Sequence, residues 1–232
     1  MTITPPHEER PTRRRRTSGA ERREAIDASA RALALRDGLQ NVTHRSIAKH
    51  LDLTNSLVVH HAPDISIVRG DACGRLLREE FTAIRALVAD CAAAVEKLAC
   101  LIRTVGTAGR EDAAGVWFDG WSIGRRDPRT AAIVRAEMDE WQAFVAQILA
   151  DGAEQGEFDL DSPQSVAWEF VALLDGLSAH TLVSYGDPAD YPTLLASPLA
   201  ARLGVPVSAL VDEQADSTAR PKPDAHRQQE AP

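Results

Sequence analysis

Apolar residues recur along most of this chain at intervals of three and four, the spacing of one face of an α-helix. The first such segment spans residues 20–36, places Ile26, Ala30 and Leu33 on one face, and is followed by Gly38, as helix ends commonly are. Further helical patterns cover residues 64–88, 90–106, 129–155, 164–184 and 191–203. The chain is therefore predicted to be all-α.

Between these segments, Val42–Ala62 predicts two short helices joined by a tight turn, the shape of a helix-turn-helix DNA reader. Thr43 and Thr54 are suited to cap the two helices, and Asp52 at the corner tolerates a left-handed backbone. Val58 and Ala62 lie one turn apart and are predicted to face inward. The opposite side of the second helix would then expose Asn55, Ser56, Leu57, Val59 and His60.

These side chains suit contacts with base edges in the major groove. Asparagine pairs with adenine, serine is adaptable, and an apolar side chain such as Leu57 or Val59 can touch a thymine methyl group. Thr54 is assigned to the same reading surface, whereas Thr43 and Arg45 are predicted to position the protein on phosphates. A helical hairpin within an ordinary bundle is the alternative interpretation.

Residues 22–63 match one known pattern in both order and spacing. The matching residues are Arg22, Arg23, Ala25, Ile26, Ala30, Leu33, Gly38, Val42, Thr43, Ile47, Ala48, Leu53, Thr54, His60, His61 and Pro63. In these residues the chain resembles the tetracycline-repressor (TetR/AcrR) family of bacterial regulators. Val59 departs from the family pattern where a phosphate-contacting tyrosine is common, and Ala62 and Ile65 where phenylalanine and lysine are usual. The resemblance implies that the helix over 64–88 links a DNA-binding head to a regulatory body.

The body resembles the choline-responsive, BetI-like branch of the same family, more loosely. The matching residues are Trp117, Phe118, Trp141, Gly152, Gly156, Glu157, Phe158, Leu174, Asp175, Gly176 and Leu177. The resemblance implies a homodimer, formed by the helices over 164–184 and 191–203 packing into a four-helix bundle. Two reading heads roughly 34–36 Å apart would match half-sites one DNA turn apart.

Large aromatic residues and acids occur together in the body and mark a candidate ligand site. Trp117, Trp121 and Trp141 accompany Glu137 and Asp175, and Phe118 and Asp119 lie among them. Aromatic faces with carboxylates suit a cationic small-molecule effector. In the alternative interpretation, the tryptophans belong to the core and the acids lie on solvated helix faces.

Charge and motifs narrow the function further. The net charge is −8, yet residues 1–60 hold 11 lysines and arginines against 7 acidic residues, a balance of +4 that suits attraction to DNA phosphates. No catalytic motif is present, and neither a metal nor a cofactor is expected. The three cysteines lack metal-ligand spacing, and the sequence shows neither a secretory signal nor an apolar run long enough to span a membrane. These features predict a cytoplasmic protein that is not membrane-bound.

The sequence thus predicts a basic arm (1–18), a helix-turn-helix DNA-binding domain (19–79, motif at 42–61), a helical ligand-binding and dimerisation domain (80–211) and a polar tail (212–232). The arm, which contains the block Arg13–Arg16, and the tail are expected to be disordered. The predicted function is a ligand-relieved repressor, acting as a homodimer on a palindromic DNA operator. A helical interaction module that has lost specific DNA binding is the alternative.

Overall fold

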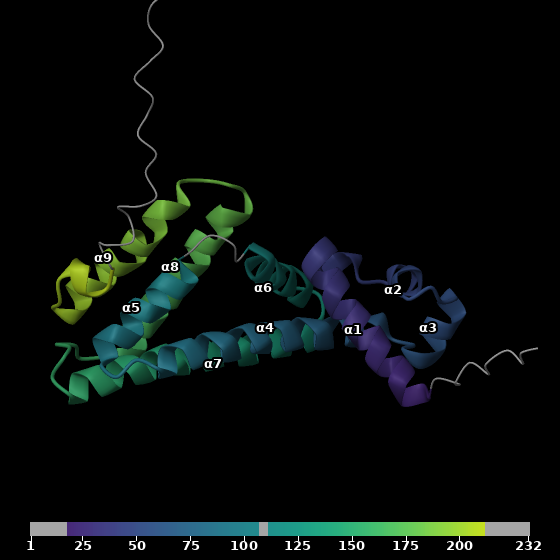
Figure 1. The fold of residues 1–232 in the computed structure, drawn as a ribbon, viewed down its shortest axis with the longest axis horizontal. Helices are drawn as coiled ribbons and strands as arrows, with labels where there is room; N and C mark the ends of the chain where they lie inside the picture. Colours follow the sequence, from purple (N-terminus) through teal and green to yellow (C-terminus); the bar gives the residue numbers. More distant parts are fainter. Residues whose placement is uncertain (1–17, 107–110, 212–232) are drawn as a thin grey trace, which may run out of the picture.

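A computed structural model describes residues 18–106 and 111–211, which fold into α-helices and short 3-10 turns without a strand. The α-helices are α1 (Gly19–Asp37), α2 (His44–His50), α3 (Asn55–His61), α4 (Ile65–Ala89), α5 (Ala94–Val105), α6 (Glu111–Gly124), α7 (Pro128–Glu154), α8 (Pro163–Leu182) and α9 (Tyr191–Leu203). The 3-10 turns are η1 (Leu39–Asn41), η2 (Pro188–Asp190) and η3 (Val207–Ala209). Helices α1–α3 form a head at one end of an elongated molecule, and α4 and α7 run along its length (Figure 1). The predicted all-α fold is confirmed.

Local sequence signals place the helices of the head. Thr43 accepts a hydrogen bond from the Ser46 amide at 3.0 Å, so it caps α2 as predicted. Thr54 caps α3 by accepting from the Leu57 amide. Asp52 adopts φ +51°, the left-handed conformation expected at the corner of the motif. The helices and the turn of this motif are therefore specified by interactions between residues close together in the sequence.

The body is organised around α4 and α7, which lie side by side and are tied together by two ion pairs. Arg78 on α4 pairs with Glu137 on α7 at 2.6 Å, and Arg129 pairs with Asp71 at 2.7 Å. Helix α4 begins at Asp64, whose carboxylate accepts from the Ser66 amide as a cap. Helices α5, α6, α8 and α9 pack around this pair and enclose the larger hydrophobic core.

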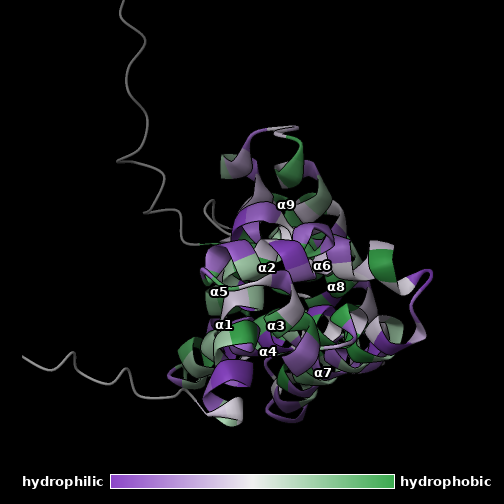
Figure 2. Cartoon of the chain, turned by 90° about the vertical axis from the view of Figure 1, so that its right-hand side faces the viewer, coloured by the Kyte–Doolittle hydropathy of each residue, from purple (hydrophilic) through white to green (hydrophobic). Residues whose placement is uncertain are grey.

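The described residues form two hydrophobic cores, which meet at α6. The smaller core joins α1–α3 to the N-terminal half of α4, and it includes Val116 of α6 and Val134 of α7. Trp117 packs against both cores. Polar and apolar residues alternate within single helices, as expected for helices that each bury one face (Figure 2). The head is therefore packed on the body through α6 as well as through α4.

Several predictions concern the chain ends, the thiols and the membrane. The predicted tail and all but the last residue of the predicted arm lie outside the described residues; that last residue, Ser18, caps α1. Cys73 and Cys100 are buried and Cys91 is half-buried, all as free thiols. None of the helices in the described part of the chain combines the length and apolar character needed to span a bilayer.

Candidate functional site: an exposed helix and an aromatic pocket

Helix α3 turns one face to solvent, and that face carries the residues predicted to read DNA. Val58 is fully buried in the head core, whereas Asn55, Ser56 and His60 are exposed. Val59 is also exposed, and Leu57 is half-buried at the edge of the same face. The structure thus brings the predicted α3 residues together on one side of a helix.

Helix α2 contributes the flank of this surface. Arg45 is exposed, and the exposed Lys49 follows it one turn later, so two cations share the outer side of the helix. Thr43 and Thr54 are exposed as well, but their hydroxyl groups already serve as helix caps. Arg45 is therefore better placed than Thr43 to reach a phosphate group.

The positions that depart from the family pattern differ in their surroundings. Ala62 is 7% exposed and belongs to the head core, where its carbonyl oxygen accepts from Nε2 of His44 at 2.7 Å. Ile65 is half-buried against the same core. Only Val59 among the three lies on the exposed face of α3. The missing aromatic group at position 59 is thus a change of the reading surface, while the changes at 62 and 65 alter packing.

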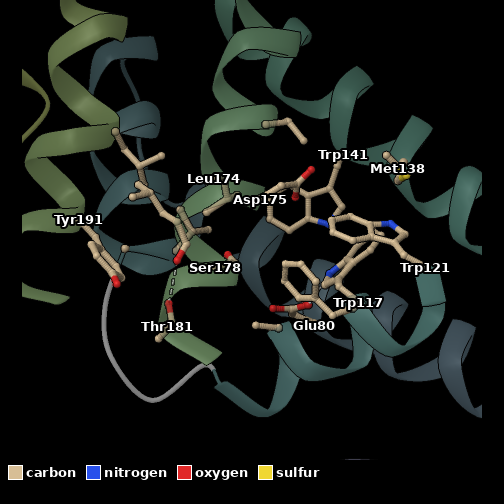
Figure 3. A pocket seen from close by; sticks show the side chains of 17 residues that line it. Glu80, Trp117, Trp121, Met138, Trp141, Leu174, Asp175, Ser178, Thr181 and Tyr191 are labelled. Atoms are coloured by element: carbon tan, nitrogen blue, oxygen red, sulfur yellow. Dashed lines mark hydrogen bonds between the residues drawn. The ribbon is translucent and has the colours of Figure 1, made fainter. Parts of the chain in front are cut away.

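A pocket lies in the body between α4 and α6–α9, next to the end of α5 (Figure 3). Its volume is about 80 Å³, several times the roughly 10–15 Å³ that one water molecule needs on the same measure, so it suits a small ligand. Its aromatic lining comprises Trp117, Phe118, Trp121, Trp141 and Tyr191. The polar lining comprises Glu80, Asp175, Ser178 and Thr181. The pocket is therefore an aromatic chamber with two carboxylates.

The charge of this chamber is negative. Among the described residues, those that line it include Glu80 and Asp175 but no lysine, arginine or histidine. Trp117 donates from Nε1 to Oε2 of Glu80 at 3.3 Å, which fixes this carboxylate beside an indole. Burial raises the pKa of the Asp175 carboxyl to about 6, because ionisation is disfavoured away from water. A bound cation would stabilise both carboxylates in their ionised forms.

Two indole N–H groups add to the polar character of this region. Nε1 of Trp121 and Nε1 of Trp141 are buried and have no hydrogen-bond acceptor within the described residues. Buried donors are nearly always paired in folded proteins, so these two indole groups are unusual polar positions beside the pocket.

The predicted pocket residues do not all meet. Trp117, Trp121, Trp141 and Asp175 line the chamber together, whereas Glu137 lies outside it. Glu137 is 4% exposed and its carboxylate is held by Arg78, so it ties α7 to α4 instead of facing the ligand site. Glu137 is therefore not among the residues that line the candidate ligand site.

Other residues at the pocket were missed by sequence reasoning. Glu80 and Tyr191 come from segments far away in the chain, and Ser178 and Thr181 lie beyond the Asp175 motif on α8. The one usable signal was helical spacing, because residues 174, 175, 178 and 181 recur at intervals of one, three and three along one side of α8. Nothing in the sequence near Glu80 points to a pocket.

Comparison with known proteins places this architecture. Residues 92–204 match the family model for the C-terminal domain of BetI-type transcriptional repressors. A structure named as a transcriptional regulator from Saccharomonospora viridis, in complex with choline, is 24% identical with a TM-score of 0.71, covering 79% of this chain and 98% of that one. No curated protein sequence matches the chain.

Two further solved structures show the same fold. A TetR-family transcriptional regulator from Agrobacterium tumefaciens is 19% identical with a TM-score of 0.66, covering 80% of this chain and all of that one. A TetR-family regulator from Rhodococcus sp. is 17% identical with a TM-score of 0.63, covering 79% and 99% of the two chains. The likeness in each case spans head and body together.

A helix-turn-helix head packed on a body that matches a transcriptional repressor domain is the architecture of a DNA-binding transcriptional regulator. Residues 92–204 thus match the BetI-type C-terminal repressor domain, and the fold of head and body together is that of the TetR-family regulators.

Proposed function

We propose that this protein is a homodimeric repressor that binds a palindromic operator and is released from it by a small organic cation. The observation that carries the effector class is the pocket, whose described lining combines three tryptophans with two carboxylates and has no basic residue. Aromatic faces and carboxylates together attract an ammonium group, by cation–π contact and by charge pairing. A quaternary ammonium compound of the size of choline, which the Saccharomonospora viridis regulator holds, fits this description.

The proposed operator contacts come from α2 and α3. Asn55, Ser56 and His60 offer hydrogen-bonding groups on one exposed face, Val59 offers a small apolar contact, and Leu57 lies at its edge. Arg45 supplies a phosphate contact beside this face. Because Val59 stands where a phosphate-contacting tyrosine is common, affinity would depend more on Arg45 and other phosphate contacts, while Asn55 and its neighbours would read the bases.

The proposed dimer face consists of the exposed sides of α8 and α9. Trp168 is 61% exposed, and Ala172 and Gly176 follow it at four-residue intervals on the same side of α8. Leu194 of α9 is 49% exposed. A Cβ atom at Gly176 would meet nothing within 4 Å in this chain, so close packing inside one protomer does not explain the glycine. A helix of a second copy packed against this stripe would explain it.

The mechanism follows from a difference in affinity between two states. An effector that binds more tightly to a body conformation with unsuitable head spacing draws the population towards that conformation. Operator affinity then falls by the same factor by which bound DNA weakens effector binding. The pocket and the reading face thus regulate each other without touching.

Binding to the DNA that flanks the gene of this protein tests the proposal. We expect tight binding that resists nonspecific competitor, decreases steeply with salt and is relieved by choline. Asn55→Ala should abolish specific binding, and Arg45→Ala should weaken binding to all sequences and reduce the salt slope by about one. Arg135→Ala, an exposed arginine on α7, is the matched control and should bind as the wild type does.

The outcomes separate two functions. Weak binding that competitor removes would contradict the repressor proposal and favour an interaction module that no longer reads DNA. If the protein binds the operator specifically and no tested organic cation releases it, the DNA-binding role stands but the proposed class of effector is wrong.

A further inference from the structure

Asp119 on α6 holds the turn that precedes the helix-turn-helix. Its Oδ2 accepts from the backbone amide of Leu39 at 2.6 Å, and its Oδ1 accepts from Nε2 of Gln40 at 3.5 Å. These residues are 80 and 79 positions away from Asp119 in the sequence. A charged acceptor for a backbone amide makes a strong hydrogen bond, so this is a firm contact between body and head.

The turn on the head side has little freedom to absorb a shift of α6. Leu39 is fully buried, and its amide has its acceptor in Asp119. Gly38 adopts φ +89°, and a Cβ atom there would lie 2.9 Å from Oδ2 of Asp119. The turn leads through Val42, which is also fully buried, into the cap residue Thr43 of α2. A displacement of the carboxylate is therefore passed on to the start of α2.

The same helix forms a wall of the pocket. Trp117 and Phe118 precede Asp119 directly, Trp121 follows two positions later, and all three aromatic residues line the chamber. Trp117 also packs on both hydrophobic cores. Helix α6 lies between α1 and α8, in contact with both (Figure 1). A ligand that packs against these rings therefore acts on the segment of helix that carries Asp119.

We propose that Asp119 is the residue that couples occupancy of the pocket to the orientation of the reading head, through its hydrogen bonds to the turn at 38–40. This inference rests on the proposed function, because it names the path by which the pocket regulates DNA binding. The path runs over α6 and η1, and it acts in addition to any tilt of α4. Asp119 touches neither the ligand chamber nor the reading face, so its role is positional.

The test compares operator affinity with and without choline in three variants of the full-length protein. Asp119→Ala removes both acceptors, Asp119→Asn keeps one oxygen for the Leu39 amide, and Asp112→Ala removes an exposed aspartate from the first turn of the same helix as the matched control. Filter binding without a fluorescent label measures the affinity for the operator. Calorimetry measures the affinity for choline, both of the free protein and of the protein–DNA complex.

For coupled sites, the ratio of the operator affinity without choline to the operator affinity with choline is on the order of 5–150. We expect this ratio to fall to within about two-fold of unity in Asp119→Ala and to persist in Asp119→Asn and Asp112→Ala. Choline affinity of the free protein should remain within about two-fold of wild type in all variants, which a general loss of folding would not allow. Amide hydrogen exchange at residues 39–41 should rise in Asp119→Ala and, in the wild type, on addition of choline.

Each result decides between the two proposals. If the wild type responds to choline and Asp119→Ala responds equally, the coupling role is overturned while the proposed function stands. If Asp119→Ala loses its head fold, Asp119→Asn decides, together with hydrogen exchange at residues 39–41. A ratio that falls together with the protection of these amides supports the hydrogen bond as the coupling contact, and a wild-type ratio despite lost protection overturns it. A wild type that does not respond to choline overturns the proposed choline-class effector, and the coupling proposal with it.

Discussion

Binding of a permanently charged effector should depend on pH through Asp175. Choline keeps its charge at every pH, so a change in its affinity reports on the protein. Burial raises the pKa of Asp175 to about 6, so at pH 8 nearly every pocket holds a carboxylate and at pH 5 only about one in ten does. If the protonated form does not bind, the apparent dissociation constant rises about ten-fold between pH 8 and pH 5.

The direction of the pH effect depends on which protonation state of Asp175 the ligand prefers. A cation stabilises the ionised carboxyl, so binding lowers the pKa of Asp175 and releases protons. Near pH 6, where about half of the pockets are protonated, calorimetry in buffers of different ionisation enthalpy should detect about half a proton released per choline bound. Above pH 8 this release should vanish.

Asp175→Asn is the control that isolates this residue. The variant should bind choline more weakly at pH 8, with an affinity that changes little between pH 8 and pH 5. Glu80, the other carboxylate of the pocket, is unchanged in this variant. A wild-type affinity that is flat over this range, or a pH dependence that survives in Asp175→Asn, would refute the assignment of Asp175 as the cation's partner.

Three further predictions concern stability and assembly. Gly152→Ala should destabilise the fold by about 1–3 kcal/mol in denaturant unfolding, because its Cβ would overlap an aromatic ring beneath it. Gly115→Ala, where nothing lies within 4 Å of the added Cβ, should instead stabilise α6 by about 0.4–1 kcal/mol. Equal effects of the two substitutions would contradict the packing argument. Arg78→Met leaves a buried carboxylate on α7 without its ion pair and should cost about 1–3 kcal/mol in denaturant unfolding. If the proposed dimer forms, Trp168→Glu should convert it to a species of 25.1 kDa in light scattering, while Leu87→Glu, which changes an exposed apolar residue on α4, should leave the mass unchanged. A Trp168→Glu protein that remains dimeric would place the interface elsewhere.

The parts of the fold that sequence reasoning recovered depend on short-range physics. A cap such as Thr54 acts on an amide three residues away, and the left-handed turn at Asp52 depends on one residue's own backbone. The apolar periodicity of α1, α4 and α7 reflects which face of each helix is buried. Such signals can be read from a window of a few residues.

The remaining features join distant segments, and no local pattern encodes them. Glu137 resembles any other acid near a tryptophan, and only the fold shows that Arg78 neutralises it. Glu157 likewise accepts from the amides of Ala94 and Val95 and so caps α5 across more than 60 residues. The two carboxylates of the pocket, the tether at Asp119 and the ion pairs of α4 with α7 all follow from how helices pack, which periodicity does not specify.

The distribution of the tryptophans gives the protein two built-in optical reporters. Of the four tryptophans in the chain, three line the pocket, and the fourth, Trp168, stands in solvent on the outer side of α8. Buried indoles emit at shorter wavelengths than solvated ones, and a carboxylate or cation nearby quenches or shifts them. Effector binding should therefore change the blue part of the intrinsic fluorescence, while burial of Trp168 against a second copy should change the red part. A single unlabelled sample can report both events.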